Sequence, residues 1–320
     1  MNFPHISISA GIKKKALKAV WPIIRAVLLI SLGYVLLYPL LYIVSVAIRP
    51  YTELSDPSVV WIPKSLTLDN FKAAMEAMNY TKSLQTSLIL NVASAAIQIC
   101  SAAVAGYGFA RFKFKFSKLL FGAVIFTIIV PPQTFVISSY LDYFAFDFYG
   151  IGSFLGLFTG NVLTVNLLDT PLTFYLPALF AQGLRGGLFV FIFRQFFKGL
   201  PRELEDAAYI DGCGFIRTFL TIMVPLSGAA FLSSVLFSLV WYWNDTLSIS
   251  MFFSQSKTVS YALDTIGSAL ASTADSQGNY FLRSARLQAA CVLTVGPIVI
   301  LYMVLQRYFT ESIDKVGIKG

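Results

Sequence analysis

Long runs of apolar residues alternate with short polar connections along the chain. Each run has about 20 residues or more, the length that an α-helix needs to cross the hydrocarbon core of a bilayer. The runs are continuous instead of alternating at every second residue, so they favour helices over the strands of a β-barrel. We therefore expect six transmembrane helices, over residues 19–47, 84–109, 119–140, 172–197, 226–248 and 285–309.

The third and fourth expected helices contain the clearest interruptions of helical structure. Pro131 and Pro132 fall inside the third, where a ring without an N–H should kink or break the helix. The fourth carries Arg185 near its middle, and a charge there costs at least about 2.5 kcal/mol to insert. Gly183 and Gly186 flank this arginine, which favours a bent or broken helix. We expect Arg185 to lie in a translocation path or in an ion pair between helices; alternatively, the fourth helix begins later and Arg185 lies near the membrane surface.

A charged segment, residues 199–225, separates the fourth expected helix from the fifth. Pro201 suits the first turn of a helix, where its missing N–H is not needed. The acids Glu205 and Asp206 then lie near the positive N-terminal end of that helix. Pro225 marks a second break, where the chain becomes apolar again.

Small residues follow the two acids. Ala207 and Ala208 favour a helix and allow another surface to approach the backbone closely. Gly212 and Gly214 indicate that this helix stops and the chain turns. The segment thus predicts a short helix, a glycine turn and a second helix, an arrangement suited to docking another protein.

Charge places the connections on the two sides of the membrane, because cytoplasmic loops carry an excess of Lys and Arg. Residues 1–19 are basic, and residues 111–118 carry basic side chains with no acid. Residues 141–171 have acids without Lys or Arg. We therefore expect both termini in the cytoplasm, together with the charged segment, as tails over residues 1–19 and 310–320.

The outer connections contain weaker signals. Asp69, within the connection 49–83, predicts a short capped helix that lies outside. The connection 141–171 is partly apolar, so it can hold an interfacial or re-entrant helix. Residues 249–283 are rich in Ser, Thr and Asn, and we expect them to lie outside as a connection.

Composition agrees with an integral membrane protein. Of the 320 residues, 57% are hydrophobic and 12% are charged, about half the charged fraction of a soluble protein. The net charge of +8 is typical of basic cytoplasmic loops and does not indicate nucleic-acid binding. The fold class is therefore an all-α membrane protein in a single transmembrane domain, residues 1–320.

Side chains that carry chemistry are scarce. The three cysteines, Cys100, Cys213 and Cys291, lie in or beside apolar runs and predict neither a disulfide framework nor a metal site. The single histidine, His5, lies in the N-terminal tail. We found no phosphate-binding loop of the GxxxxGK[ST] type, so any ATP that powers this protein must bind another chain. No cofactor is expected here.

The charged segment resembles the EAA signature of the inner-membrane permeases of bacterial ABC importers. The signature is present as Asp206-Ala207-Ala208, then Gly212, then Ile-Met-Val-Pro at residues 222–225, with Asp where Glu is usual and Val where Leu is usual. The carbohydrate subfamily (maltose-type, MalG-like) is similar in the sequences that surround it. These are Phe-Arg-Gln-Phe-Phe at residues 193–197, Ile-Asp-Gly at 210–212, Trp-Asn-Asp at 243–245 and the C-terminal residues 315–320.

The resemblance implies a type I ABC importer permease fold and a heteromeric complex. The implied partners are a second permease, two ATPase subunits that hold ATP and Mg²⁺, and an extracellular solute-binding protein. The implied substrate is a carbohydrate, and more narrowly an oligosaccharide. The loop 199–225 would contain the coupling helix that contacts the ATPase. The implied coupling residues are Glu205, Asp206, Ala207, Ala208 and Gly212.

Asn244 and Asp245 are further candidates for the translocation path. They follow three aromatic residues at the end of the fifth expected helix, and such groups can bind a sugar or form an ordinary interfacial aromatic belt. An ABC permease for a non-sugar solute, an ion channel and an integral membrane enzyme are the alternatives. The last would need clustered His, Asp or Glu at membrane depth, which the sequence lacks. The sequence does not identify the sugar or its charge, or which of Glu205 and Asp206 is the coupling acid.

Overall fold

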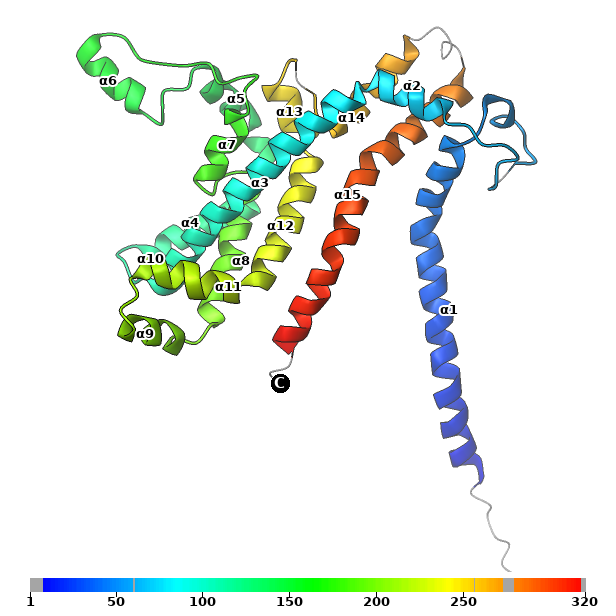
Figure 1. The fold of residues 1–320 in the computed structure, drawn as a ribbon, viewed down its shortest axis with the longest axis horizontal. Coiled ribbons are helices and arrows are strands. Elements are labelled where there is room, and N and C mark those ends of the chain that lie inside the picture. The colour runs from blue at the N-terminus through cyan, green and yellow to red at the C-terminus, as the bar shows by residue number, and fades with distance from the viewer. Residues whose placement is uncertain (1–7, 60, 256, 273–278, 318–320) are drawn as a thin grey trace, which may run out of the picture.

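The computed structural model describes residues 8–59, 61–255, 257–272 and 279–317. His5 and the last three residues lie outside this part of the chain. Helices dominate the described residues and form an elongated bundle (Figure 1). Their bounds are α1 (Ile8–Ala47), α2 (Asp69–Ala77), α3 (Tyr80–Arg111), α4 (Ser117–Ile129), α5 (Val136–Phe144), α6 (Ile151–Thr159), α7 (Leu172–Leu179), α8 (Gly186–Gly199), α9 (Glu203–Ile210), α10 (Phe215–Thr218), α11 (Val224–Leu226), α12 (Gly228–Trp243), α13 (Thr246–Phe252), α14 (Val259–Ala271) and α15 (Tyr280–Gly317).

Within the described residues, 3 helices are long and apolar enough to cross a membrane. They are Val20–Ala47 in α1, Tyr80–Arg111 and Tyr280–Arg307 in α15, which match the first, second and sixth expected spans. The pair Phe215–Leu226 and Gly228–Trp243 makes a fourth if its bend of 77° is accepted within one span. The third and fourth expected spans are divided into shorter helices.

The third expected span breaks at its two prolines, as predicted. Helix α4 ends at Ile129, Pro131 is extended, and a short 3₁₀ turn begins at Pro132 before α5. A proline ring cannot donate the helical hydrogen bond and clashes with the preceding turn. The chain direction therefore changes between α4 and α5.

The fourth span is not one continuous helix. Helix α7 ends at Leu179 and α8 begins at Gly186, so residues 180–185 form a non-helical break. Ala181 and Arg185 both have a φ of 56° in this break, a conformation that disfavours a continued helix for residues with a Cβ. Arg185 thus lies immediately before α8 instead of at the centre of a helix.

Side chains from two other helices bind the backbone of this break. Gln98 of α3 donates from Nε2 to the Leu184 carbonyl over 2.8 Å, and the Leu184 N–H donates to Tyr242 Oη over 3.3 Å. The Tyr242 hydroxyl in turn donates to Gln98 Oε1. Both peptide groups of Leu184 are therefore satisfied, although residue 184 is outside a helix.

Helix α3 lies at the centre of the bundle and packs against α7, α8 and α12 (Figure 1). Its crossing with α8 is close, because a Cβ on Gly106 would lie 2.6 Å from the Phe193 Cβ. Tyr107 of α3 and Phe197 of α8 belong to the same buried apolar cluster. This packing makes α3 and α8 one unit.

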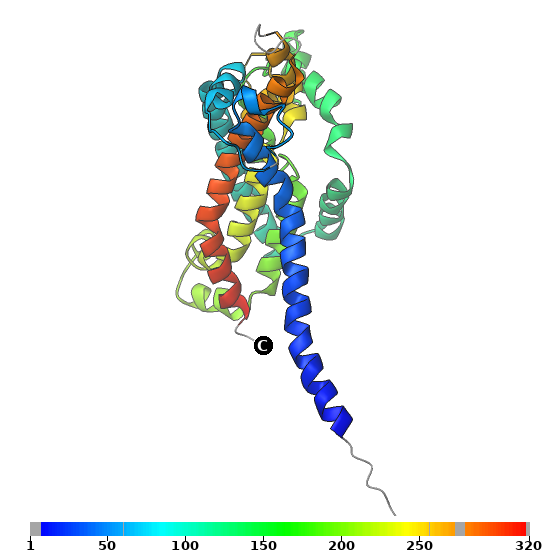
Figure 2. The same cartoon turned by 90° about the vertical axis from the view of Figure 1, so that its right-hand side faces the viewer.

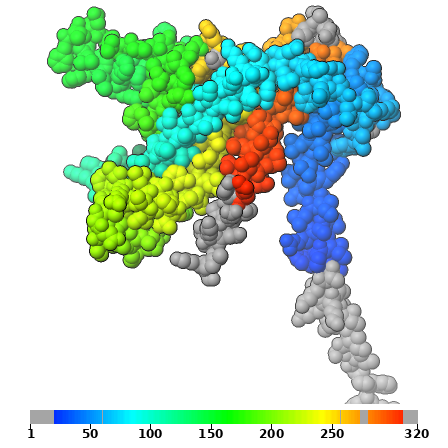
Figure 3. Space-filling view, in the orientation of Figure 1, coloured from blue at the N-terminus to red at the C-terminus, as the bar shows by residue number. Residues whose placement is uncertain are grey.

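Helix α1 stands apart from this bundle. Figures 2 and 3 show it beside the other helices, joined to them near its C-terminal end. None of its most apolar window is buried. Its exposed surface of Leu, Ile, Val and Tyr side chains needs an apolar environment outside this chain.

Several boundaries differ from the predicted ones. The fifth span ends at Trp243, earlier than residue 248, because Asp245 caps the separate helix α13 by accepting from the Ser248 N–H. Residues 249–283, expected as a connection, contain the end of α13 and all of α14. Helix α2 begins at Asp69, whose N–H donates to the Thr67 hydroxyl over 3.2 Å, while the N-cap residue Leu68 has no capping side chain. The helix allowed within 141–171 is present as α6.

Gly183 offers a test of the network around the break. A Cβ at this position would overlap Gln98 Oε1 and Tyr242 Oη, so we expect Gly183→Ala to lower stability by about 1–3 kcal/mol through overpacking. Thermal unfolding in detergent measures the change. Gly296→Ala is the matched control, because an added Cβ there meets no atom within 4 Å. Equal melting temperatures for the two variants would contradict this view of the break.

Candidate functional site

The charged segment folds as the predicted helix, glycine turn and helix. Helix α9 is followed by Gly212 with a φ of 78° and then by α10. The Cys213 N–H donates to the Ala208 carbonyl over 2.9 Å and the Gly212 N–H to the Tyr209 carbonyl over 3.1 Å, the pattern of a Schellman helix end. Pro201 lies before α9 instead of in its first turn.

The two neighbouring acids of α9 have different environments. Glu205 is only 6% exposed, whereas Asp206 is exposed. Tyr107 donates its hydroxyl to Glu205 Oε1 over 2.7 Å, and Arg111 Nε lies 2.8 Å from Oε2. Glu205 therefore faces the bundle, and Asp206 faces away from it.

The outer surface of α9 combines the exposed acid with small and apolar side chains. Ala207 is exposed beside Asp206, and Ile210 is 86% exposed at the end of the helix. Ala208, by contrast, is buried against the bundle. Figure 1 shows α9 at one end of the molecule, opposite α2 and α14. Of the five predicted coupling residues, Asp206, Ala207 and Gly212 are thus accessible to a partner.

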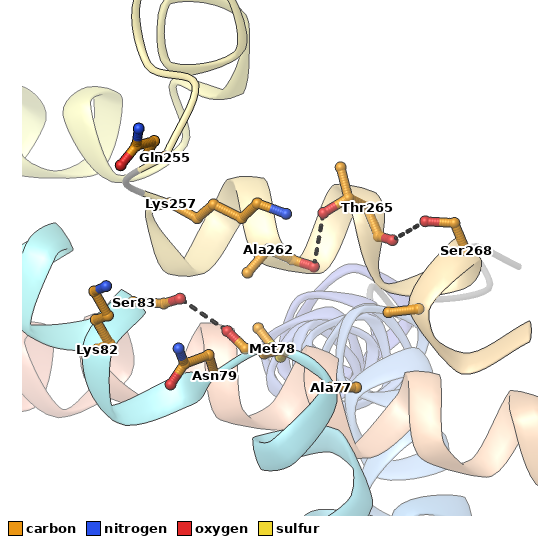
Figure 4. A pocket seen from close by; sticks show the side chains of 11 residues that line it. Ala77, Met78, Asn79, Lys82, Ser83, Gln255, Lys257, Ala262, Thr265 and Ser268 are labelled. Atoms are coloured by element: carbon orange, nitrogen blue, oxygen red, sulfur yellow. Dashed lines mark hydrogen bonds between the residues drawn. The ribbon is translucent and has the colours of Figure 1, made fainter. Parts of the chain in front are cut away.

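A cavity of about 410 Å³ lies at the opposite end of the molecule. Figure 4 shows Asn79 and Lys82 on one side, and Lys257 and Thr265 on the other. Its lining residues include two lysines and no acid. No local sequence pattern predicts this cavity, because its walls come from the α2–α3 corner, the α13–α14 connection and α14.

Asp169 fastens the α13–α14 connection near this end. Its Oδ1 accepts from the Ser254 N–H over 2.6 Å, and its Oδ2 accepts from the Ser254 hydroxyl over 2.6 Å. The Ser254 hydroxyl, assisted by backbone N–H groups, lowers the pKa of Asp169 from its usual value. The carboxylate therefore stays charged and keeps residues 141–171 in contact with this connection.

A larger cavity of about 670 Å³ opens at the break in the fourth span. Arg185 and Asp245 both line it, together with Gln182, Thr127 and several aromatic rings. The structure therefore brings together two of the three residues predicted for the translocation path. Asn244 does not line this cavity; it is exposed, and its Nδ2 donates to the Val240 carbonyl.

The two charged residues of this cavity are held differently. The Arg185 guanidinium lies 4.9 Å from the Trp241 ring centroid, a distance that allows a cation–π contact, and no acid pairs with it among the described residues. Asp245 uses Oδ1 to cap α13, accepting from the Ser248 N–H over 3.0 Å. Its buried Oδ2 has no hydrogen-bond partner in the described part of the chain. Both side chains thus belong to the lining of the cavity, with Asp245 Oδ2 buried and the Arg185 guanidinium over an aromatic ring.

Two of the three aromatic residues before Asn244 point into the bundle, whereas Trp241 is half-buried beside Arg185. Tyr242 and Trp243 are both buried. Tyr242 binds Gln98 and Leu184, and the Trp243 Nε1 donates to the Thr294 carbonyl over 3.2 Å. These rings join α12 to its neighbours instead of facing a solute.

Sequence relatives with known roles cover most of the chain. The arabinooligosaccharides transport system permease protein AraQ of Halalkalibacterium halodurans is 29% identical over 299 residues, which cover 90% of this chain and 93% of the relative. The melibiose/raffinose/stachyose import permease protein MelC of Bacillus subtilis is 28% identical over 267 residues, 83% of this chain and 86% of MelC. The trehalose transport system permease protein SugB of Mycobacterium tuberculosis is 25% identical over 289 residues, 90% of this chain and 94% of SugB.

The fold is also that of a solved transporter. A chain of a bacterial ABC transporter involved in the import of the acidic polysaccharide alginate superposes with a TM-score of 0.73 and 18% sequence identity, covering 96% of this chain and 100% of that one. The family model described as binding-protein-dependent transport system inner membrane component matches residues 99–315. That region contains α8, α9 and both walls of the larger cavity. This chain therefore belongs to the family of inner membrane components of binding-protein-dependent transport systems.

Proposed function

We propose that this protein is the transmembrane permease subunit of a bacterial ABC importer for a carbohydrate, specifically an oligosaccharide. The observation that carries the proposal is α9, a short helix whose exposed face ends the bundle and offers Asp206 and Ala207 to a partner. The names of the relatives, which include importers of arabinooligosaccharides and of melibiose, raffinose and stachyose, support the substrate class. The subunit transports, and a separate chain hydrolyses ATP.

The helices are consistent with six crossings of the membrane. Each broken pair then counts as one crossing: α4 with α5, and α7 with α8, in addition to α1, α3, α10–α12 and α15. With both termini in the cytoplasm, α9 lies on the cytoplasmic side, while α2, α14 and the cavity of Figure 4 lie outside. The basic connection between α3 and α4 supports this orientation.

The partners follow from the surfaces that this chain leaves uncovered. A second permease and lipid would cover the apolar surface of α1 and the rest of the bundle. Two ATPase subunits would bind ATP and Mg²⁺, and one of them would contact α9. An extracellular solute-binding protein would deliver the carbohydrate to the outer side. Neither a cofactor of its own nor nucleic acid has a role in this scheme.

Asp206 is the coupling acid in this proposal, because its carboxylate is exposed and can pair with a basic group of the ATPase. Glu205 is engaged inside the bundle. Arg185 and Asp245 would contact the solute as it passes the cavity, and Asn244 would lie outside the path. ATP binding shifts the populations of inward- and outward-facing states only as far as it binds one of them better.

Reconstitution tests the proposed function directly. We expect proteoliposomes with this subunit, its second permease and the ATPase to take up labelled oligosaccharide only when ATP and the solute-binding protein are present. Uptake that needs no ATP would indicate a channel. ATP-dependent uptake of a non-sugar solute, with no uptake of any oligosaccharide, would overturn the substrate class.

Gly212 tests the shape of the docking helix. Val at a φ of 78° is strained by about 1–2 kcal/mol, so Gly212→Val should distort the end of α9 and weaken binding of the ATPase. Co-purification of the ATPase at graded concentrations measures this effect. Gly214→Val is the matched control, since Gly214 has a φ of −75° in an extended conformation that Val adopts readily. Equal ATPase binding by the two variants would count against the turn.

The larger cavity supplies a test of the transport path. Arg185→Gln removes the charge, and Asp245→Asn keeps the cap of α13 while changing the acceptor Oδ2. If the cavity holds the solute, each variant should lower oligosaccharide uptake about tenfold, equivalent to about 1.4 kcal/mol, while the complex still hydrolyses ATP. Normal uptake by both variants would remove this cavity from the path.

A further inference from the structure

We propose that Glu205, with Tyr107 and Arg111, is an internal anchor that makes α9 move together with α3. Glu205 is thus a positioning residue, and Asp206 contacts the ATPase. This inference rests on the proposed role of α9 as the helix that receives the ATPase.

The anchor consists of the Glu205 carboxylate and the two side chains that bind it, Tyr107 and Arg111. Tyr107 Oη and Arg111 Nε lie 2.7 Å and 2.8 Å from the two oxygens of Glu205. The Arg111 side chain is 7% exposed, and its Nη2 donates to the Leu200 carbonyl over 2.9 Å. Arg111 therefore holds both α9 and the chain that leads into it.

Burial makes this ion pair different from an ordinary surface pair. Exposed pairs contribute little, because water and salt screen them. Separating the two partners of a buried pair leaves a buried charge without compensation, which strongly destabilises the separated state. The buried pair therefore holds α9 in one position relative to α3.

Few contacts besides these fasten α9 to the bundle, and one of them is the interaction of the Tyr209 side chain with the Tyr107 hydroxyl. Glu205 and Ala208 are its only buried residues. The Ala208 side chain is a single methyl group, so its apolar contact does not fix the orientation of α9. The anchor accordingly decides how a push on the outer face of α9 passes into the membrane part of the protein.

Helix α3, which is bound to α9 at one end, also binds the break beside the larger cavity. Gln98 binds the Leu184 carbonyl, and Ser101 Oγ donates to the Ala178 carbonyl over 2.6 Å. Gln98 and Arg111 lie on the same helix, which contains no proline, at a separation of about 20 Å for a rise of 1.5 Å per residue. One continuous helix thus connects the docking helix to the cavity wall.

The test uses the complete complex of both permeases, the ATPase and the binding protein. Glu205→Gln removes the charge that pairs with Arg111, and Glu203→Gln removes an exposed charge of the same helix. We expect the Glu205→Gln complex to assemble and hydrolyse ATP, but to consume at least about fivefold more ATP per solute, the lower end of usual coupling factors. Glu203→Gln should keep the wild-type ratio.

A crosslink distinguishes a mechanical tie from a loss of folding. In a protein with Cys100, Cys213 and Cys291 replaced by Ser, we would introduce Arg111→Cys and Glu205→Cys and join them with a short bismaleimide. The crosslinked complex should regain the wild-type ATP-to-solute ratio, and the unlinked complex should not.

The outcomes separate the anchor from the proposed function. Wild-type coupling in Glu205→Gln, or no recovery on crosslinking, would overturn the anchor while leaving the transport function intact. Failure of the wild-type protein to bind any ATPase would instead overturn the proposed function. If Glu205→Gln does not assemble, the crosslinked and unlinked double variants decide the question alone.

Discussion

A helix that breaks within a membrane leaves peptide N–H and C=O groups that lipid cannot satisfy. In this protein the break between α7 and α8 depends on Gln98 and Tyr242, which together bind both the N–H and the C=O of Leu184. The absence of a side chain at Gly183 lets the two polar groups approach. Without these contacts, neither the start of α8 nor the position of Arg185 would be defined.

The same helix that supplies Gln98 supplies Arg111 to α9. The two neighbouring acids therefore have different environments: Glu205 is paired inside the bundle, whereas Asp206 is exposed and accessible to a partner. A short exposed helix with a fixed attachment can transmit a displacement, whereas a loosely attached one would absorb it. The cavity with Arg185 and Asp245 lies next to the break, so displacement of α3 reaches the residues proposed to meet the solute.

Hydropathy and turn chemistry predicted the local elements well. The continuous apolar helices α1, α3 and α15, the break at Pro131 and Pro132, and the turn at Gly212 each depend on a residue pattern within a few turns of chain. The family was also recognisable from the spacing of Asp206, Ala207, Ala208 and Gly212, and the match to residues 99–315 confirms it.

Features that depend on distant residues could not be predicted. Gln98 is 86 residues from Leu184, and Tyr107 is 98 residues from Glu205. No local pattern shows that Glu205 turns inward while Asp206 turns outward. The aromatic residues before Asn244 allow a sugar platform by their type alone, but Tyr242 and Trp243 are needed for packing and hydrogen bonds between helices.

We propose that the outer face of α9 receives the ATPase. Site-specific crosslinking from Asp206→Cys, in the assembled complex with the native cysteines replaced, measures this most directly. Thr265→Cys, at the opposite end of the molecule beside the cavity of Figure 4, is the control position. We expect a crosslink to the ATPase from residue 206 and none from residue 265. No crosslink from residue 206, or an equal crosslink from both positions, would show that this face of α9 does not receive the ATPase.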